Sequence, residues 1–393
     1  MTDNSFLNWP FFEERHHKMA TSLGAWAEKN IRPLSYAPEP KDNDTLDVQC
    51  ADILAKLAEG NWLSLAVPEN NNAKHDVRSI CLARETLAEQ AGLADFVFAM
   101  QGLGSGAIAL FGTDDQKNAY LPLVRAGKSV AAFALSEPEA GSDVAAISTT
   151  AIKDGDDYLI SGTKTFISNG GIANFYCIFA RTNQKSGAKG LSAFIVDKNT
   201  TGLDDKYRIE LLAPHPLADV KLDNCRVPKS AMIGAEGDGF KIAMATLDIF
   251  RPSVGAAALG FARRALSETI KHTKNRKAFG ASLADLQMTQ STIADMATNI
   301  DASALLIYRA AWQKDISQDR ITLEAAMAKL FSTESAQQIV DSAVQLHGGS
   351  GVVAGAIVEK LYREVRALRI YEGASEVQKL IIAKQILSNT AEQ

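Results

Sequence analysis

Glu372 is the residue whose neighbours in the sequence best suit acid–base chemistry. It lies in the segment 371–375 (YEGAS), between a basic, helix-compatible stretch (358–370) and an apolar-periodic one that begins at Val377. A carboxyl group at such a junction can project into a cavity, where burial raises its pKa toward that of a general base. An acidic residue in the first turn of the following helix, favoured by the helix dipole, would give the same local pattern. The segment alone therefore leaves a catalytic and a structural interpretation open.

Four other segments carry residue types that could bind an anionic or heterocyclic ligand. Two are polar, turn-rich loops, 136–143 (SEPEAGSD) and 166–171 (FISNGG), whose backbone N–H groups could hold a phosphate. The others are 275–280 (NRKAFG), which contains cations, and 347–351 (HGGSG), which is rich in glycine. Turn chemistry and helix capping are an alternative explanation for all four. The glycine-rich segment also lacks the preceding strand and the G-x-G-x-x-G spacing of a dinucleotide fold.

Motifs of several other enzyme classes are absent from the sequence. It contains no H-E-x-x-H, no G-x-S-x-G and no G-x-x-x-x-G-K-[ST], which excludes the commonest metalloprotease, serine-hydrolase and nucleotide-triphosphatase signatures. The 4 cysteines are far apart and form no C-x-x-C pair, and the 6 histidines are scattered. We therefore predict neither a disulfide framework nor a metal site.

Three regions of different hydrophobic periodicity must position these segments. Residues 1–128 show helical spacing, with a helix start at Gly112-Thr113. Residues 129–238 contain short runs of β-branched and aromatic residues, and Asp154–Asp157 predicts a hairpin with an Asp-Gly turn. Residues 239–393 return to the helical period, and an apolar stripe predicts a helix that ends at His347. The expected fold is α+β: a helical domain, then an antiparallel β-barrel or sandwich, then a helix bundle.

Charge and hydropathy narrow the class of protein further. The 393 residues include 41 Lys+Arg and 46 Asp+Glu, a formal charge of −5, without a basic block, which argues against a nucleic-acid-binding protein. No uninterrupted apolar run approaches the roughly 18–20 residues of a membrane span, so we expect none. Because residues 1–4 show no basic or apolar leader pattern, a cytoplasmic location is the expectation.

Five segments in this order resemble the acyl-CoA dehydrogenase family of flavoproteins, and the resemblance extends from about Phe11 to Leu387. The segments are 133–143 (FALSEPEAGSD), 162–171 (GTKTFISNGG), 276–280 (RKAFG), 345–351 (QLHGGSG) and 369–378 (RIYEGASEVQ). The resemblance implies a helical N-terminal domain (1–128), a middle antiparallel β-barrel domain (129–238) and a C-terminal four-helix bundle (239–393). It also implies non-covalently bound FAD, a homotetramer, an acyl-CoA substrate and an electron-transfer flavoprotein as partner. No nucleic acid is expected.

The same resemblance assigns roles to particular residues. It implies that Glu372 removes the α-proton of the thioester while the β-hydride passes to flavin N5, and that Arg251 supports this base. Some members carry the base on another helix, at the position of Phe250, which cannot accept a proton. The resemblance implies flavin contacts at Phe133, Leu135, Ser136, Phe166 and Ser168, cofactor contacts from the neighbouring subunit at Arg276, Phe279, Gln345, Gly348 and Gly349, and substrate contacts at Ser142, Leu247, Tyr371 and Gly373.

Two departures from the family pattern affect the expected specificity. Many relatives have Trp where this chain has Phe166, and 211–220 (LLAPHPLADV) replaces a Gly-, Arg-, Ser- and Thr-containing turn with Pro214-His215-Pro216. The resemblance therefore leaves the acyl group open. Two alternative functions also remain: an acyl-CoA oxidase or other flavoenzyme on the same scaffold, and a catalytically silent binding protein.

Overall fold

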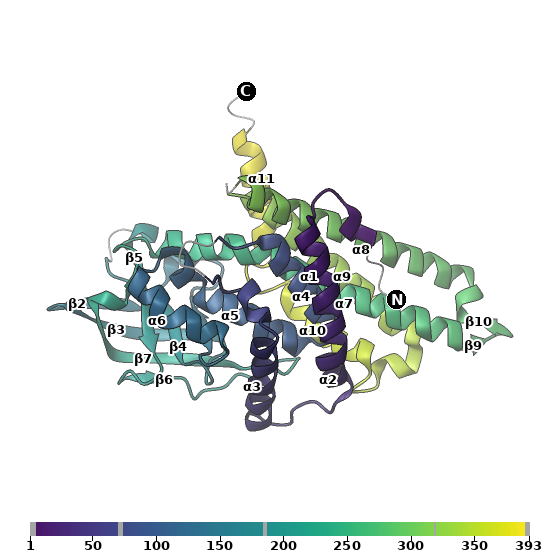
Figure 1. The fold of residues 1–393 in the computed structure, drawn as a ribbon, viewed down its shortest axis with the longest axis horizontal. Helices are drawn as coiled ribbons and strands as arrows, with labels where there is room; N and C mark the ends of the chain where they lie inside the picture. The colour runs from purple at the N-terminus through teal and green to yellow at the C-terminus, as the bar shows by residue number, and fades with distance from the viewer. Residues whose placement is uncertain (1–4, 70–73, 184–186, 318–319, 390–393) are drawn as a thin grey trace. The chain divides into compact units, whose positions relative to one another are not determined.

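The computed structural model describes residues 5–69, 74–183, 187–317 and 320–389, which form two compact units (Figure 1). The helical unit comprises Met1–Glu39, Asp76–Asp95 and Asp248–Gln393. The sheet unit comprises Pro40–His75 and Phe96–Leu247. Both units contain helices from the N-terminal part of the chain, because each unit combines segments that are not consecutive in the sequence. The boundaries of the three consecutive domains, 1–128, 129–238 and 239–393, stay a prediction.

One mixed sheet forms the centre of the sheet unit. Its main path runs β6-β7-β3-β2-β4-β5-β8, and β1 pairs with β4. The strands are β1 (Ala131–Ala134), β2 (Thr150–Asp154), β3 (Asp157–Ser168), β4 (Phe175–Arg181), β5 (Leu191–Asp197), β6 (Leu203–Asp204), β7 (Leu217–Pro228) and β8 (Met232–Ile233). The pairs β1–β4 and β2–β4 are parallel, whereas the other strand pairs in this sheet are antiparallel. A β-rich middle region is thus confirmed, but its sheet is mixed, because a loop and a hairpin separate β1 from β4.

The predicted Asp-Gly hairpin is present and directs β2 into β3. Asp154 pairs with Asp157, so Gly155 and Asp156 form a two-residue loop, with Gly155 at φ 64°. Farther along β3 the register with β7 shifts between Lys164 and Ile167. Phe166 has φ 54° at this irregularity and is 62% exposed. The shift therefore turns an aromatic side chain away from the core of the sheet.

Helices accompany the sheet in this unit, and one of them, α5 (Gly92–Phe111), holds the start of β1. These helices are α3 (Asn43–Glu59), α6 (Asp114–Arg125) and the part of α5 from Phe96 onward. As predicted, Thr113 caps α6, and a reciprocal bond with Gln116 completes a capping box. The buried Gln101 of α5 accepts from Ala131 N (3.0 Å), and a Cβ on Gly104 would lie 2.6 Å from the Ala131 carbonyl carbon. Close packing of this kind requires glycine at position 104.

Helices, several of them long, build the other unit. They are α1 (Glu14–Asn30), α2 (Arg32–Tyr36), α4 (Val77–Gln90), α7 (Gly239–Asn275, from Asp248 onward), α8 (Gln287–Ser317), α9 (Thr322–His347), α10 (Ile357–Leu368) and α11 (Ser375–Asn389). A short hairpin, β9 (Lys277–Ala278) with β10 (Ala281–Ser282), follows α7. The predicted end of α9 at His347 is confirmed, because Gly348 follows it at φ 59°.

The predicted apolar stripe of α9 only partly matches the face that the helix buries. Small and polar side chains, among them Ala325, Lys329 and Ser332, are buried, whereas Leu330 and Phe331 are partly exposed. α9 contacts α8, α10 and α11. Small residues allow these helices to approach α9 closely on several sides, so hydropathy alone does not identify the buried face.

Two helices are long and apolar enough to cross a membrane when judged by length and composition alone, namely α5 and α7. Their most apolar windows are 83% and 89% buried within the structure, as in the core helices of soluble proteins.

Candidate active site

The turn between α10 and α11 carries Glu372 in an unusual backbone conformation. α10 ends at Leu368 and α11 begins at Ser375, so Glu372 lies outside the first turn of the following helix. Glu372 has φ 52° and Gly373 has φ 96°, both in the left-handed region. A non-glycine residue in this region is strained and persists only where its surroundings fix it. The interpretation of Glu372 as a simple helix-start residue is therefore wrong.

Side chains from three helices fix the carbonyl groups of this turn. Arg251 of α7 donates from Nε to the Glu372 carbonyl (3.3 Å). Lys329 of α9 donates from Nζ to the Gly373 carbonyl (2.7 Å), and Gln378 of α11 donates from Nε2 to the same oxygen (2.9 Å). A Cβ on Gly373 would lie 2.3 Å from Gln378 Nε2. The turn thus needs glycine at position 373, and charged donors from α7 and α9 hold its carbonyl groups.

One oxygen of the Glu372 carboxyl group is buried and unsatisfied. Its Oε2 atom is buried and has no hydrogen-bond partner among the described residues. Burial raises the pKa of Glu372, and the nearby positive charges of Arg84, Arg251 and Lys329 oppose that rise. The negative charge of Asp95 adds to it. A carboxylate that is desolvated and unpaired in this way is poised to accept a proton.

The cations around Glu372 differ in how they are paired. Arg84, which is 1% exposed, binds Asp95 through Nε and Nη2, both at 2.8 Å. Arg251 Nη1 lies 3.6 Å from Asp248 Oδ1. Lys329, in contrast, has no carboxylate oxygen within 4.0 Å among residues 5–69, 74–183, 187–317 and 320–389.

The other substrate-side predictions divide between the two units. Tyr371 and Gly373 flank Glu372 in the same turn, with Tyr371 38% exposed. Phe250 is buried on α7, one residue before Arg251. Leu247 and Ser142 belong to the sheet unit, Leu247 on α7 and Ser142 in the loop after β1.

The predicted flavin residues of the sheet unit come from two neighbouring segments. Phe133 lies on β1, and Leu135 and Ser136 directly follow that strand. Phe166 and Ser168 lie on β3. Thr165 N donates to Ser136 O (3.0 Å), so the two segments that the sequence singled out are side by side.

A buried ion pair fastens these two segments together. Lys164 of β3 and Glu137 are 0% and 4% exposed, and Lys164 Nζ lies 2.8 Å from Glu137 Oε1. Lys164 also donates to Leu135 O (3.2 Å), while Glu137 accepts from Ser148 N (2.7 Å) and Thr149 N (3.0 Å). Although burial raises the pKa of Glu137, Lys164 and these donors lower it to about 2. Burial lowers the pKa of Lys164 to about 8.

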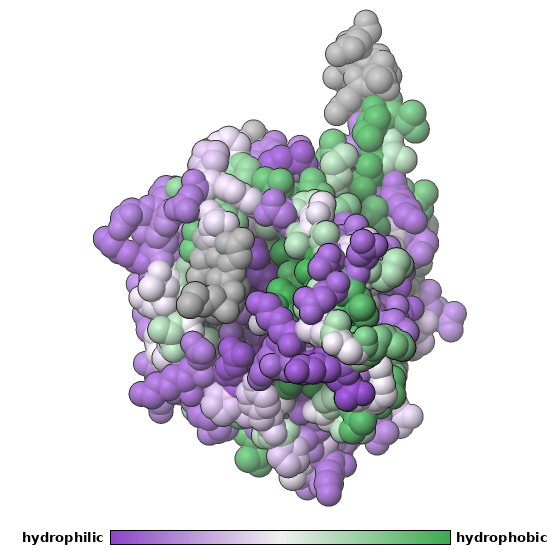
Figure 2. Space-filling model, turned by 90° about the vertical axis from the view of Figure 1, so that its right-hand side faces the viewer, coloured by the Kyte–Doolittle hydropathy of each residue, from purple (hydrophilic) through white to green (hydrophobic). Residues whose placement is uncertain are grey.

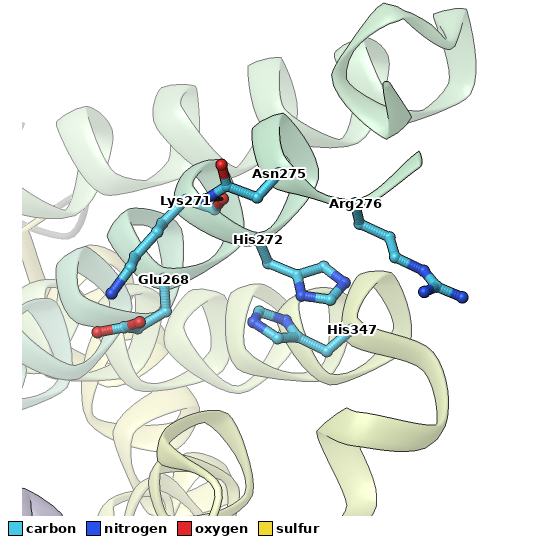
Figure 3. A pocket seen from close by; sticks show the side chains of 6 residues that line it. All are labelled: Glu268, Lys271, His272, Asn275, Arg276 and His347. Atoms are coloured by element: carbon cyan, nitrogen blue, oxygen red, sulfur yellow. Dashed lines mark hydrogen bonds between the residues drawn. The ribbon is translucent and has the colours of Figure 1, made fainter. Parts of the chain in front are cut away.

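The predicted cofactor residues of the helical unit lie at or just after the ends of α7 and α9. A recess there has a volume of about 400 Å³. It is lined by Glu268, Lys271, His272, Asn275, Arg276 and His347, whose side chains are drawn in Figure 3. The rings of His272 and His347 are stacked with centroids 4.3 Å apart. Gln345 lies in the last turn of α9, and Gly348 and Gly349 follow it. Phe279, in the hairpin after α7, has φ 52° and is 94% exposed.

These residues fit a flavin nucleotide, which combines an anionic pyrophosphate with aromatic rings. A Cβ added to Gly141, Gly280, Gly348 or Gly349 would meet no atom within 4 Å, so a ligand can approach the backbone there. Lys271 and Arg276 supply cations at the recess. Phe166 and Phe279 supply exposed aromatic rings. The chain thus has cations and accessible backbone for the pyrophosphate, and aromatic rings for the rings of the nucleotide.

Sequence reasoning missed several residues that fix the site. Lys329, Gln378 and Arg84 lie in helices, where each reads as an ordinary polar residue. The one available signal is a Lys inside the otherwise small and apolar stretch 325–331 (AAMAKLF). It indicates burial of a charge but does not identify its partner.

Comparison with known proteins places the whole chain in one family. Models of the acyl-CoA dehydrogenase N-terminal, middle and C-terminal domains match residues 13–128, 132–225 and 237–387. A 3-(aryl)acrylate reductase of Clostridium sporogenes is 37% identical over 388 residues, which are 96% of this chain and 100% of that protein. The caffeyl-CoA reductase-Etf complex subunit CarC of Acetobacterium woodii is 38% identical, over 86% of this chain and 89% of that protein.

A solved structure agrees with this assignment. Butyryl-CoA dehydrogenase from Megasphaera elsdenii has a TM-score of 0.85 and 31% identity, covering 96% of this chain and 99% of that chain. The chain therefore belongs to the acyl-CoA dehydrogenase family, flavoprotein oxidoreductases that act on acyl-CoA thioesters.

Proposed function

We propose that this enzyme binds FAD and converts an acyl-CoA thioester into its trans-2-enoyl-CoA, with Glu372 as the base. The observation that carries this proposal is the buried, unpartnered Oε2 of Glu372 in a strained turn. The reaction removes two hydrogens from the substrate: the α-hydrogen leaves as a proton and the β-hydrogen as a hydride. Bound FAD supplies the hydride acceptor. The chain itself must therefore bind the thioester, accept the proton and stabilise the charge that develops.

Glu372 performs the proton transfer through a carboxylate that water solvates poorly. Its raised pKa makes it a stronger base than a solvated glutamate, while the charges of Arg84, Arg251 and Lys329 favour the ionised form that the reaction needs. The α-proton is only weakly acidic, so the thioester carbonyl must be polarised as enolate character develops. The backbone N–H of Glu372 is the donor proposed for that carbonyl. Arg251 supports both tasks because it binds the carbonyl of the same residue.

FAD would be held by residues of two subunits. Phe133, Leu135, Ser136, Phe166 and Ser168 would contact the flavin from one chain. Arg276, Phe279, Gln345, Gly348 and Gly349 would contact the cofactor of a neighbouring chain in a homotetramer. The surface supports an oligomer, because Leu380 and Leu387 of α11 are each 71% exposed and the C-terminal helix shows apolar side chains in Figure 2.

The names of relatives support a class of substrate and an electron acceptor for this proposal. Ser142, Leu247, Tyr371 and Gly373 are the proposed substrate contacts. The names of two relatives refer to aryl acrylate and caffeyl-CoA, so the panel of acyl groups must include an aryl-substituted one. One of these relatives is a subunit of a complex with Etf, which supports an electron-transfer flavoprotein as the partner. A cytoplasmic location stays a prediction.

Anaerobic titration of the purified enzyme with CoA thioesters tests this proposal. The panel comprises butyryl-, octanoyl-, cyclohexanecarbonyl- and 3-phenylpropionyl-CoA, and the readout is bleaching of the flavin absorbance. We expect at least one thioester to bleach the flavin and free CoA to leave it oxidised. If no thioester bleaches a fully flavin-loaded enzyme, the proposed dehydrogenation is wrong. Release of peroxide during aerobic turnover would identify an oxidase instead.

A further inference from the structure

Lys329 is a buried lysine whose ammonium group binds the backbone of the turn that carries the proposed base. It forms no ion pair within the described part of the chain. It lies in the middle of α9 and is 0% exposed. Its Nζ donates to the Gly373 carbonyl at 2.7 Å, one residue beyond Glu372. Lysine is almost never fully buried without a paired carboxylate, because removing an ammonium group from water is costly. The position of Lys329 therefore requires a compensating charge nearby.

Glu372 directly precedes the residue whose carbonyl Lys329 binds, and it is the carboxylate that best supplies this charge. Its negative charge has the largest effect of any neighbouring group in raising the pKa of Lys329, ahead of those of Glu334 and Glu376. Glu334 already binds Arg369, with Nη2 and Oε2 2.7 Å apart. Glu376 lies in the first turn of α11 and is exposed.

Other positive charges that act on Glu372 come from α4 and α7. Arg84 of α4 and Arg251 of α7 are positive, and each has its own carboxylate, Asp95 and Asp248 respectively. Lys329 is thus the cation of this group without a paired carboxylate in the described part of the chain. Its charge and that of Glu372 compensate each other.

We propose that Lys329 is a positioning residue for Glu372: it fixes the strained turn through the Gly373 carbonyl and supplies the positive charge that keeps the buried carboxyl group ionised. This inference rests on the function proposed above. Two separable properties are involved, a hydrogen bond and a charge.

The two properties predict different consequences for substitution. Burial lowers the pKa of Lys329 to about 8, so its ammonium form is present below that pH. Removing a positive charge beside Glu372 raises the pKa of Glu372. Since the base works in its ionised form, the acidic limb of the pH–rate profile must then move to higher pH. Removing the hydrogen bond instead releases the turn.

Three variants separate these effects. Lys329→Gln retains a donor but removes the charge, Lys329→Met removes both, and Lys329→Arg retains both in a larger group. Lys360 provides the matched control, because its Nζ donates to the carbonyls of Ser35 (3.0 Å) and Ala37 (3.1 Å) in the same unit. For each variant the flavin-reduction rate is measured against pH, together with thioester affinity and amide hydrogen exchange in the peptide 369–378.

We expect Lys329→Gln to keep native exchange in 369–378, to shift the acidic limb upward by about one pH unit and to slow reduction about tenfold below it. Lys329→Met should also accelerate exchange there and slow reduction by about 100-fold, with thioester affinity changed by no more than about twofold. Lys329→Arg should restore the pH profile more fully than Lys329→Gln. The Lys360→Gln and Lys360→Met variants should keep the wild-type profile.

Two results would overturn the inference. One is a wild-type pH profile and wild-type exchange in both Lys329→Gln and Lys329→Met. The other is a general loss of protection across the unit, with an unshifted pH profile, which would show a purely structural role. Failure of the wild-type enzyme to react with any thioester would instead refute the proposed function, and the exchange measurement would still test whether Lys329 fixes the turn.

Discussion

At the scale of single residues, the site depends on two adjacent positions with left-handed backbone. Glu372 and Gly373 have φ of 52° and 96°, and conformations of this kind cost on the order of 1–3 kcal/mol for a residue with a side chain. Hydrogen bonds from Arg251, Lys329 and Gln378 to the two carbonyls offset this strain. The backbone of the turn is thus held in place, while Oε2 of Glu372 has no hydrogen-bond partner among the described residues.

Substitution of Gly373 tests this role of the backbone. In Gly373→Ala the new Cβ would lie 2.3 Å from Gln378 Nε2, so the amide must move and its bond to the Gly373 carbonyl is lost. We expect the free energy of unfolding to fall by about 2–3 kcal/mol and flavin reduction to slow. Gly24→Ala is the control, because no atom lies within 4 Å of its added Cβ and alanine favours a helix by roughly 0.5–1 kcal/mol. Equal stabilities of the two variants in denaturant unfolding would contradict the argument.

The sequence predicts some of these residues and not others for a physical reason. Glu372 and Gly373 are recognisable because a break between two helices is a local pattern. Lys329 reaches the Gly373 carbonyl from a helix that lies far away in the chain, and no local spacing encodes such a contact. Arg84 acts on Glu372 only through its charge, from α4. Gln378 lies five residues after Gly373, but nothing in the sequence distinguishes it from an ordinary polar residue of a helix. Their roles became visible only when the helices were placed in space.

At the scale of elements, the link between β3 and the loop after β1 shapes the proposed flavin site. The Lys164–Glu137 pair is buried, and the Glu137 carboxylate also binds the backbone of Ser148 and Thr149. One carboxylate thereby joins three segments of the sheet unit. The sequence predicted the two loops, but it showed neither this pair nor the parallel pairing of β1 with β4, because both depend on which strands become neighbours.

Removal of Lys164 tests the link. Lys164→Met leaves Glu137 buried without its counter-ion, so we expect the free energy of unfolding to fall by about 3–5 kcal/mol and FAD content to drop. Adding Glu137→Gln should recover part of that stability, because no unpaired charge then remains. Arg226→Ala is the surface control: it breaks exposed pairs with Asp154 and Asp157 and should change stability far less than Lys164→Met does.

The pH dependence of unfolding gives a second check on the same pair. The pKa of Glu137 is lowered from 4.5 to about 2 in the folded state. A lowered carboxyl pKa means that the folded state favours the ionised form, so this stabilisation is complete above pH 4.5 and is lost as pH falls toward 2. Lys164→Met should lose much of this acid sensitivity. An unchanged acid limb in that variant would show that Lys164 does not stabilise the carboxylate.

At the scale of the whole molecule, sequence motifs predict which residues belong to the site. They do not predict how these residues are arranged in space. The family models match three consecutive parts of the chain, whereas the contacts divide it into two units. The proposed flavin contacts on β1, after β1 and on β3 belong to the sheet unit. Glu372, Arg251 and Tyr371 belong to the helical unit. The overall α–β–α order was predictable because hydrophobic periodicity changes twice along the chain. A residue that contacts the cofactor of a second subunit produces no periodic pattern in the sequence. The prediction of such contacts therefore rests on the resemblance to the family alone.

The most direct measurement of the central claim is rapid anaerobic reduction of the Glu372→Gln enzyme by the thioester that bleaches the wild-type flavin best. Glutamine preserves the size of the side chain and the backbone but cannot accept the α-proton. The account predicts unchanged FAD content, thioester affinity within about twofold and a reduction rate lowered by about 10²–10⁴-fold. The exposed Glu14→Gln variant should react like the wild type. Reduction of Glu372→Gln at the wild-type rate would contradict the assignment of Glu372 as the base.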